Sequence, residues 1–352
     1  MIYLHVPFCR SFCTYCDFYS EIACKGKNVA ATARWADEVC AEIDARREEI
    51  ESTLDLDTLY IGGGTPSVLP LSVLQRILGD LEAIRYGQSY SEFTIEVNPE
   101  DIIERGPEYV QGLLDLGVTR FSMGVQSLDD GILRWMNRRH SADGARKAFH
   151  LIQSAAHGEI LPCAAISIDL ITGVPGMTTE ILESTLDEVI RWHPEHISAY
   201  QLSIEEGSAL AQMIEEGRVA ELDEESCRTQ YELVCRRLAE AGYHHYEISN
   251  WAIPGHEAVH NSAYWTRHPY VGLGPGAHSL IFYNAAGPLP VADGKQRRSW
   301  NSQSLSGWTS EYEILSAEQI HEEEVMLLAR TDRGPIPERD WFIADEIIPS
   351  LL

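Results

Sequence analysis

The sequence predicts an α/β protein whose core is an open, curved sheet of six parallel strands, a partial, TIM-barrel-like (β/α)6 fold. Three observations predict this fold class. Six short runs of β-branched and apolar residues recur over the first 206 residues, and each is followed by a segment with helical periodicity. The connections are short, which favours right-handed crossovers and parallel strands. Polar or glycine-rich motifs stand near the strand ends, at the rim where parallel sheets form their sites.

The predicted strands share β-branched and aromatic residues, and they cover residues 2–6, 58–61, 93–97, 120–125, 164–171 and 196–202. The predicted helices share apolar residues spaced three or four apart, and they cover residues 34–51, 71–84, 109–116, 143–157 and 178–192. Six βα units are too few to close an eight-fold barrel. We therefore expect the sheet to stay open.

The pattern changes after residue 206, and the sequence divides into three predicted parts. Residues 1–206 form the core. Residues 207–284 extend it with a helix over 223–241, followed by an irregular stretch rich in glycine, histidine and aromatic residues. Residues 285–352 form a smaller, partly helical C-terminal domain with a helix over 317–330. We expect the polar, glycine-rich run at 285–306 to be a surface excursion or linker.

Charge and composition exclude several classes of partner. The chain has 54 acidic and 27 Lys or Arg residues, giving a net charge of −27. Such a surface repels phosphate backbones, so we expect no nucleic-acid partner. The sequence shows no signal peptide, transit peptide or transmembrane run, and we expect a cytoplasmic protein. Five of the eight cysteines are scattered, which indicates buried apolar residues rather than a disulfide framework.

The other three cysteines follow the first predicted strand. Cys9, Cys13 and Cys16 form a CxxxCxxC motif. A 4Fe-4S cluster usually takes four cysteine thiolates, so a loop with three leaves one iron open to an outside ligand. The alternative is a zinc site of the Cys₃His type, completed by a histidine such as His5. Zinc loops more often pair two CxxC knuckles, and the sequence has no second knuckle, so the spacing favours the iron–sulfur cluster.

Two further features stand at strand ends. The motif GGGTP at residues 62–66 follows the second strand. Glycine has no Cβ and lets the backbone approach a ligand closely, although a tight turn is the alternative. Glu96 lies near the end of the third strand and faces the core. An unpaired carboxylate there is costly, so we expect a ribose hydroxyl or a cationic group as its partner.

Seven motifs carry a resemblance to a known family, namely YLHVPFC, GGGTP, IEVNP, RFSMGVQS, NRRH, DLITGVPG and YVGLGPGAHS. From Tyr3 to about Arg330 the chain resembles radical S-adenosylmethionine (SAM) proteins of one group. That group contains the oxygen-independent coproporphyrinogen III dehydrogenases (HemN) and the HemW-type heme chaperones. The resemblance implies a 4Fe-4S cluster on the three cysteines, with SAM chelating the fourth iron.

The resemblance also implies which residues surround this cofactor. Those that would border SAM and the cluster are Tyr3 and Tyr15. Those that would meet the methionine end of SAM are Gly63, Gly64 and Thr65. Those that would reach its ribose and carboxylate are Glu96, Gln126, Arg138 and Asp169. Each has an alternative as an ion-paired rim residue, above all Arg138 in its basic run.

Three features separate the two branches of this family. The dehydrogenases carry a fourth cysteine two residues after the third, where this chain has Phe18. They also carry an N-terminal extension that helps to enclose the substrate, and this sequence has none. HNSAYW at residues 260–265 resembles the HNxxYW motif of the chaperones, which is associated with heme binding. On this resemblance His260 is the heme ligand, and the alternative is a hydrogen-bonded packing histidine.

The favoured function is a heme chaperone that binds a 4Fe-4S cluster, SAM and heme and delivers heme to acceptor hemoproteins, expected among respiratory proteins. The alternative is an oxygen-independent coproporphyrinogen III dehydrogenase, which decarboxylates propionate side chains in porphyrin biosynthesis. A non-catalytic zinc protein is a third hypothesis. No residue is assigned a catalytic role, and monomer and homodimer are both compatible with the sequence. Members of the family generally continue beyond the position of Leu352, so we expect a shortened C-terminal domain.

Overall fold

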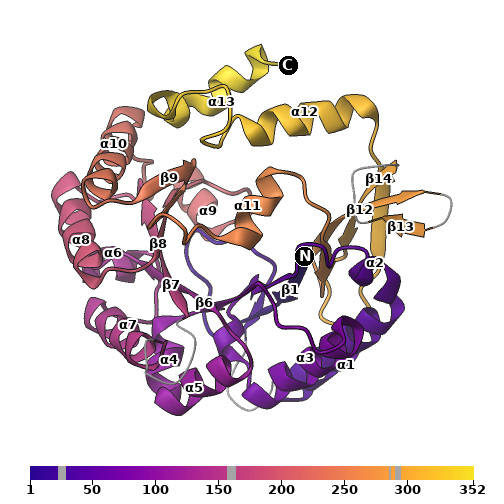
Figure 1. The fold of residues 1–352 in the computed structure, drawn as a ribbon. Helices are drawn as coiled ribbons and strands as arrows, with labels where there is room; N and C mark the ends of the chain where they lie inside the picture. The colour runs from indigo at the N-terminus through magenta and orange to yellow at the C-terminus, as the bar shows by residue number, and fades with distance from the viewer. Residues whose placement is uncertain (23–28, 157–163, 285–286, 290–294) are drawn as a thin grey trace.

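A computed structural model describes residues 1–22, 29–156, 164–284, 287–289 and 295–352. The described residues form a nine-stranded sheet in the order β11-β1-β4-β5-β6-β7-β8-β10-β9. Its parallel central strands are β1 (Ile2–Val6), β4 (Thr58–Gly63), β5 (Glu92–Val97), β6 (Arg120–Gln126), β7 (Ala165–Thr172) and β8 (His196–Gln201). Helices cover the outside of the curved sheet (Figure 1). The predicted open (β/α)6 core is therefore confirmed.

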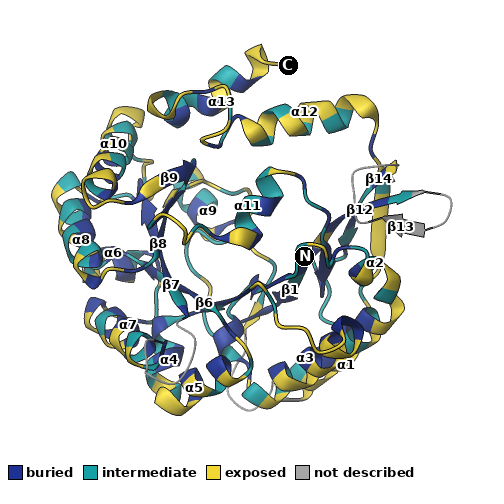
Figure 2. Ribbon diagram, in the orientation of Figure 1, coloured by how far each residue is buried: buried dark blue, intermediate teal, exposed yellow. Residues whose placement is uncertain are grey.

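The helices between these strands have an apolar and a polar side. They are α1 (Val29–Ala45), α2 (Arg47–Glu51), α3 (Leu71–Arg85), α4 (Pro99–Arg105), α5 (Pro107–Asp115), α6 (Asp130–Trp135), α7 (Ala142–Ala156) and α8 (Thr179–Trp192). Figure 2 shows their buried residues toward the sheet and their exposed residues toward the outside. The helix predicted over 34–51 is two helices, because Arg46 leaves the helical conformation between them. Residue 157, the predicted end of another helix, lies outside the described residues.

Residues alternate along the central strands between an apolar outer face and a polar inner face. On β5, Phe93, Ile95 and Val97 belong to the main hydrophobic core, whereas Thr94 and Glu96 line cavities on the inner face. A parallel sheet with both faces covered by apolar helices would show continuous apolar runs instead. The alternation leaves the inner face of this sheet to polar groups.

The stretch after the core extends the sheet at both edges. The predicted helix at 223–241 is confirmed as α10 (Glu224–Glu240), and α9 (Ala209–Glu215) precedes it. Beyond it, β9 (His244–Glu247) and β10 (Asn250–Ala252) form an antiparallel edge next to β8. Helix α11 (Val259–Trp265) follows, and β11 (Val271–Leu273) pairs parallel with β1. The irregular stretch therefore returns the chain to its first strand.

The described residues also form a four-stranded antiparallel sheet in the order β13-β12-β14-β15. Its strands are β12 (His278–Asn284), β13 (Gly287–Leu289), β14 (Lys295–Asn301) and β15 (Ser310–Ile314). The expectation of a surface excursion over 285–306 is therefore wrong for β13 and β14, while residues 285–286 and 290–294 lie outside the described residues. The predicted boundary after residue 284 falls between two paired strands of this sheet, and the division into domains stays a prediction.

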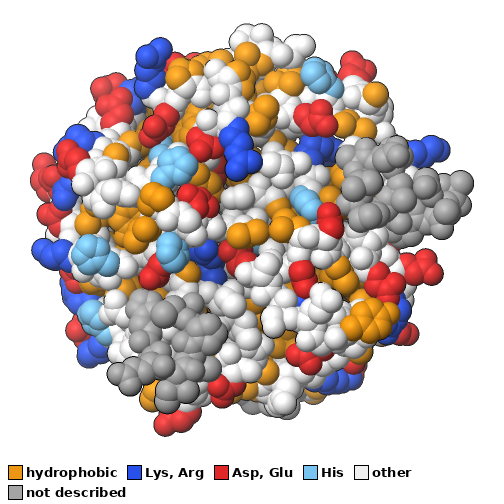
Figure 3. All heavy atoms as spheres, viewed as in Figure 1, with side chains coloured by type: hydrophobic (Ala, Val, Ile, Leu, Met, Phe, Trp, Pro, Cys, Tyr) orange, Lys and Arg blue, Asp and Glu red, His pale blue; other side chains and the backbone are white. Residues whose placement is uncertain are grey.

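The C-terminal segment packs beside α10 and β9. It contains α12 (Ala317–Leu328), the 3-10 turn η2 (Glu338–Ile343), α13 (Ala344–Ile347) and the turn η3 (Ile348–Ser350). A small hydrophobic cluster around Trp341 packs against Tyr231 of α10 and Ile248 after β9. Acidic and basic side chains are interspersed on the face shown in Figure 3. In the described residues, none of the helices combines the length and the hydropathy that a membrane crossing requires.

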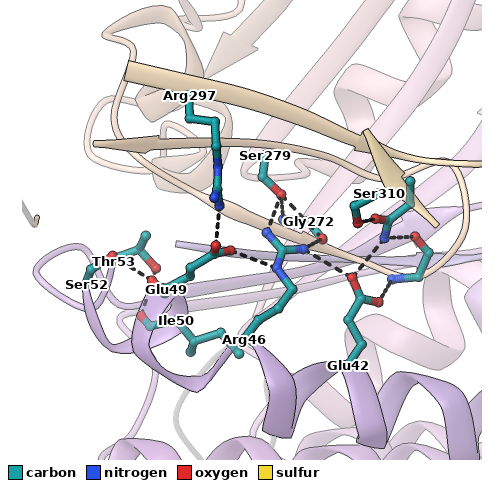
Figure 4. A network of polar contacts seen from close by, with 12 residues as sticks. Glu42, Arg46, Glu49, Ile50, Ser52, Thr53, Gly272, Ser279, Arg297 and Ser310 are labelled. Atoms are coloured by element: carbon teal, nitrogen blue, oxygen red, sulfur yellow. Dashed lines mark hydrogen bonds and ion pairs between the residues drawn. The ribbon is translucent and has the colours of Figure 1, made fainter. Parts of the chain in front are cut away.

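Arg46 joins the first two helices to both sheets. Its guanidinium donates to the Gly272 carbonyl of β11 at 2.7 Å and to the Ser279 hydroxyl of β12 at 2.9 Å. Its Nε donates to Glu49 at 2.8 Å, and Glu49 also pairs with Arg297 of β14. Figure 4 shows these side chains converging between α2 and the strands.

Glu42 on α1 provides a second connection in the same place. Its carboxylate accepts hydrogen bonds from the Gly274 amide at 2.9 Å, the Asn301 side chain at 2.9 Å and the Trp308 indole at 3.1 Å. The two residues fix the four-stranded sheet against α1, α2 and β11 through largely buried polar contacts.

Candidate functional site

The loop that carries Cys9, Cys13 and Cys16 leaves the core at the end of β1. It begins in β2 (Phe8–Cys9), and β3 (Glu21–Ile22) pairs with that strand in parallel. All three cysteines line one cavity of about 580 Å³. Burial raises the pKa of the Cys9 thiol and raises that of Cys16 to about 11. A bound metal would offset this penalty, because metal ligation requires the thiolate.

The same cavity brings together most of the other predicted site residues. Those that line it are Tyr15, Gly63, Gly64, Thr65, Glu96, Gln126, Arg138 and Asp169. They come from the cysteine loop and from the carboxyl ends of β4, β5, β6 and β7, or the segments that follow. The expectation that the strand-end motifs meet at one rim is therefore confirmed, whereas their binding roles stay predictions. Tyr3 and His260 do not line this cavity and lie on a smaller one of about 120 Å³.

Gly64 allows the cysteine loop to lie directly on the end of β4. Its amide donates to the Val6 carbonyl at 2.8 Å, and the Thr65 amide donates to the Phe8 carbonyl at 2.8 Å. A Cβ at position 64 would lie 2.8 Å from both carbonyl oxygens. Both are backbone atoms, so a larger residue would displace the start of the loop. The Thr65 hydroxyl also lies 3.3 Å from the Cys9 sulfur.

Two half-buried carboxyl groups line the cavity. Glu96 accepts hydrogen bonds from the Tyr60 hydroxyl at 2.8 Å and the Gly63 amide at 3.2 Å. Asp169 accepts one from the Ser122 hydroxyl at 2.7 Å. Burial raises the pKa of Glu96 to about 8 and that of Asp169 to about 6. A cationic ligand in the cavity would favour the ionised form of both groups.

Arg138 and Gln126 line the cavity, and each has a buried polar atom without a partner. The Arg138 guanidinium donates to the Gly124 carbonyl at 2.7 Å and to the Cys13 sulfur at 3.3 Å, while its Nε has no partner. Gln126 has a φ of 66°, a left-handed conformation that is rare outside glycine, and its Oε1 also has no partner. Strain and unsatisfied polar atoms together are typical of a ligand site.

The side chain of His5 holds the end of the cysteine loop through hydrogen bonds. The Tyr3 hydroxyl lies 3.1 Å from His5 Nδ1, and His5 Nε2 lies 2.8 Å from the Tyr19 carbonyl. Because a carbonyl only accepts, Nε2 carries the proton and Nδ1 accepts from the Tyr3 hydroxyl. Both ring nitrogens are therefore engaged, and His5 offers no lone pair to a zinc ion held by the cysteines.

The three loop thiols suit a cluster better than a single ion. Thiolates around one tetrahedral zinc ion lie roughly 3.8 Å apart. Within the described residues, the sulfur atoms of Cys9, Cys13 and Cys16 are not all within 4.8 Å of one another. Wider spacing, a large cavity and unpartnered polar atoms around it fit a 4Fe-4S cluster with an organic ligand beside it.

His260 lies at the other end of the sheet. Its Nδ1 is 2.8 Å from the Thr58 hydroxyl, and its Nε2 is 2.9 Å from the Tyr264 hydroxyl. Thr58 begins β4, which puts His260 about 16 Å along that strand from the glycine motif. The side chain is buried, and burial lowers its pKa to about 3. The imidazole is therefore neutral but has no free nitrogen here, and its role in heme binding stays a prediction.

A buried ion pair between Glu92 and Arg120 holds helix α11, which carries His260, in place. The Glu92 carboxylate accepts from the amides of Val259 at 3.0 Å and His260 at 2.8 Å. Arg120 donates to the same carboxylate at 3.0 Å and to the His256 carbonyl at 2.9 Å. The helix closes the inner face of the sheet at the end opposite the cysteine loop.

The sequence did not single out Tyr60 or Ser122, which orient the site, and it suggested His5 only as a zinc ligand. They lie inside strands rather than in strand-end motifs. The available signal was the alternation of polar residues with a period of two, as in Thr94 and Glu96, which marks the inner face of each strand.

Comparisons with known proteins identify relatives of this chain. The model of the radical SAM superfamily matches residues 3–189. The heme chaperone HemW of Mycobacterium tuberculosis is 33% identical over 340 residues, which cover 95% of this chain and 82% of that protein. The heme chaperone HemW of Bacillus subtilis is 30% identical, with 99% of this chain and 89% of that protein covered.

Among solved structures, coproporphyrinogen III oxidase (HemN) from Escherichia coli matches with a TM-score of 0.67. It is 19% identical, and the match covers 92% of this chain and 74% of that one. At this identity the likeness concerns the fold. The family model spans more than half of the sequence, and the HemW relatives align with nearly all of it. The chain therefore belongs to the radical SAM superfamily and, within it, to the family of the HemW heme chaperones.

Proposed function

We propose that this protein is a heme chaperone that holds a 4Fe-4S cluster and SAM in the cavity of the cysteine loop, binds heme and delivers it to acceptor hemoproteins. The observation that carries the proposal is the set of three thiols on a cavity of about 580 Å³, in a chain aligned with HemW proteins over nearly its whole length. Membership of the superfamily implies the cluster and SAM, and the names of the relatives suggest heme.

In this proposal Cys9, Cys13 and Cys16 each hold one iron. A cluster held in this way supplies a redox-active centre with one iron open to the amino and carboxylate groups of SAM. Gly64 sets the height of the loop above β4, since its missing Cβ allows the loop backbone to contact the strand. Arg138, which lies 3.3 Å from the Cys13 sulfur, offsets the negative charge of thiolates and sulfides.

The remaining residues of the cavity would bind and orient SAM. Its sulfonium charge would favour ionised Glu96 and Asp169, whose pKa values burial raises in the free protein. Gln126 and Arg138 line the same cavity and would reach its ribose or carboxylate. Tyr15 lines the same cavity next to the cysteines. Tyr3 would act on the loop through His5, because its hydroxyl bonds to His5 and His5 bonds to the Tyr19 carbonyl of the loop.

Heme binding through His260 requires a local change. Nε2 would exchange its hydrogen bond to Tyr264 for the heme iron, while Thr58 keeps Nδ1 in place. The neutral imidazole is the protonation state that ligates iron. Tyr264 and Trp265 would then offer flat apolar area to a porphyrin face. In this proposal the protein acts in the cytoplasm, where its loop thiols stay reduced. Its acceptors are respiratory hemoproteins, and it works as a monomer or a homodimer.

Two anaerobic assays on one cluster-reconstituted sample test this function. A heme titration should show a Soret shift that saturates at one heme per chain. The second assay supplies coproporphyrinogen III, SAM and a reductant, and the proposal expects no protoporphyrinogen IX. Conversion of coproporphyrinogen III without heme binding would identify a dehydrogenase and overturn the chaperone proposal.

Two variants test the part played by His260. His260→Ala should weaken heme binding at least tenfold, because it removes the ligand. Tyr264→Phe should bind heme at least as tightly as the wild type, because it removes the hydroxyl that competes for Nε2. Equal heme affinity in His260→Ala and wild type would show that another residue binds the iron.

A further inference from the structure

Cys235, His245 and Glu338 come together outside the cavity of the cysteine loop, which none of them lines. Cys235 lies on α10, His245 on β9 and Glu338 at the start of η2. One ligand atom from each lies within 4.8 Å of the other two. The three elements meet where the C-terminal segment packs beside α10 and β9 (Figure 1).

The ring of His245 is fixed with one nitrogen toward this cluster. Nδ1 lies 2.8 Å from the Glu338 carboxylate, and Nε2 lies 3.4 Å from the Ile248 carbonyl. The ring stacks on Trp251, with the centroids 4.0 Å apart, and meets the edge of Trp341 at 4.5 Å. The two indoles leave the imidazole little freedom to rotate and exclude water from its faces.

Both nitrogens of His245 therefore face oxygen atoms that act as acceptors. A neutral imidazole has one proton, and the Ile248 carbonyl can only accept it. The contact to Glu338 is short and the contact to the Ile248 carbonyl is long, so in the metal-free protein Nδ1 can donate its proton to the carboxylate. When the proton lies on Nε2 instead, the Nδ1 lone pair faces the Glu338 carboxylate, and the two groups together can hold a metal ion. A ring N–H donated to a backbone carbonyl is also the usual second contact of a metal-bound histidine.

Cys235 adds a third donor to this pair. Its sulfur lies within 4.8 Å of both other ligand atoms. With a divalent metal, one thiolate and one carboxylate balance the charge of the ion, and the imidazole completes a set of sulfur, nitrogen and oxygen donors.

We propose that Cys235, His245 and Glu338 bind a zinc ion that ties the C-terminal segment to α10 and β9. Zinc takes this mixture of donors in tetrahedral sites. Water supplies the fourth ligand, because the Glu338 side chain is 56% exposed while that of His245 is 4% exposed. The ion would hold α10, β9 and η2 together. Two of its ligands, His245 on β9 and Glu338 on η2, are 93 residues apart in the sequence.

The test uses the full chain with its iron–sulfur cluster in place, grown with added zinc. Elemental analysis should give one zinc per chain in addition to iron. X-ray absorption at the zinc edge should show one sulfur at about 2.3 Å and nitrogen or oxygen ligands at about 2.0–2.2 Å. Absence of zinc would overturn the proposal. Zinc with three sulfur ligands would also overturn it, because that ion would sit on the cysteine loop.

Variants distinguish the loss of the zinc site from a general loss of folding. Cys235→Ala should lose the zinc but keep iron and sulfide. Glu338→Gln, which alters a largely exposed side chain, should do the same. Cys227→Ala is the matched control, because Cys227 lies on the same helix two turns earlier and contacts the Leu222 carbonyl instead. A zinc chelator should lower the Tm of wild type and Cys227→Ala and leave that of Glu338→Gln unchanged. Zinc retained by Glu338→Gln at the wild-type level would contradict the assignment.

Discussion

Glu96 shows how single residues of the cavity trade stability for binding. Its half-buried carboxyl accepts hydrogen bonds from Tyr60 and Gly63 and lies near a second half-buried acid, Asp169. Native proteins seldom leave such a group without a cationic partner, because the ionised form pays a desolvation penalty. The penalty falls on the free protein and is relieved when a cation enters the cavity.

The pH dependence of stability should reveal this penalty. Burial raises the pKa of Glu96 from 4.5 to about 8, so between these values the folded state binds the proton that the unfolded state has released. The stability of the cofactor-free protein should therefore fall as pH rises from about 5 to 8. Glu96→Gln should flatten this part of the profile, measured by urea denaturation at several pH values.

A matched variant makes this prediction specific. Glu82→Gln alters an exposed residue of α3 and should leave the pH profile unchanged. If Glu96→Gln and wild type lose stability equally between pH 5 and 8, Glu96 is ionised in the folded protein throughout, and its environment differs from the one described.

At the scale of elements, the ends of β1 and β4 act together to place the cysteine loop. Backbone hydrogen bonds join Val6 to Gly64 and Phe8 to Thr65, so the loop begins from a fixed height above the strand. The geometry leaves no volume for a side chain at Gly64. The loop position therefore depends on the missing side chain of Gly64, apart from any contact that this residue makes with SAM.

Gly64→Ala should lose most of the iron that the wild type takes up on reconstitution. The new methyl group would lie 2.8 Å from two backbone oxygens, and such overpacking costs about 1–3 kcal/mol. Gly79→Ala is the control, since Gly79 lies on exposed α3 with open space around it, and alanine there should stabilise the helix by up to about 1 kcal/mol. Normal iron content in Gly64→Ala would show that the loop tolerates the shift.

Elements also show what sequence reasoning could reach. Strands β5 and β6 were predicted within one residue of their ends, because β-branched runs bounded by turns are local signals. Helices α4 and α6 were missed because they are short, although their capping residues Asn98 and Asp129 mark both starts. Strand β14 was missed because its polar side chains find their partners on distant elements, as Arg297 does on Glu49.

The functional site, like the fold, could be predicted only in part. The cysteine loop and the glycine motif are contiguous in sequence, so their residues could be named in advance. The position of His260 depends on a contact with Thr58, 202 residues away, and on the register of α11 against Glu92. No local pattern reports such contacts, which is why its burial could not be anticipated.

For the whole molecule, the polar network around Arg46 connects the core to the four-stranded sheet. The Arg46 side chain is 14% exposed and bonds to β11, β12 and Glu49. Arg46→Ala should lower the free energy of unfolding by about 3 kcal/mol, because it removes the cation paired with the Glu42 carboxylate and the donor to the Gly272 carbonyl. Urea denaturation measures the change.

The neighbouring position provides the control for this prediction. Arg47 is 43% exposed and pairs with Asp44 at 3.7 Å, so Arg47→Ala should cost less than about 1 kcal/mol. Equal losses from the two variants would mean that the Arg46 network contributes no more than an ordinary surface ion pair.

The central claim is that the cavity of Cys9, Cys13 and Cys16 holds a 4Fe-4S cluster with one iron open to SAM. The most direct measurement is electron paramagnetic resonance of the reconstituted, reduced protein with and without SAM. We predict the signal of a reduced 4Fe-4S cluster whose g values shift when SAM is added, and no such signal in Cys13→Ala. A spectrum that SAM leaves unchanged, or wild-type iron and sulfide content in Cys13→Ala, would contradict the account.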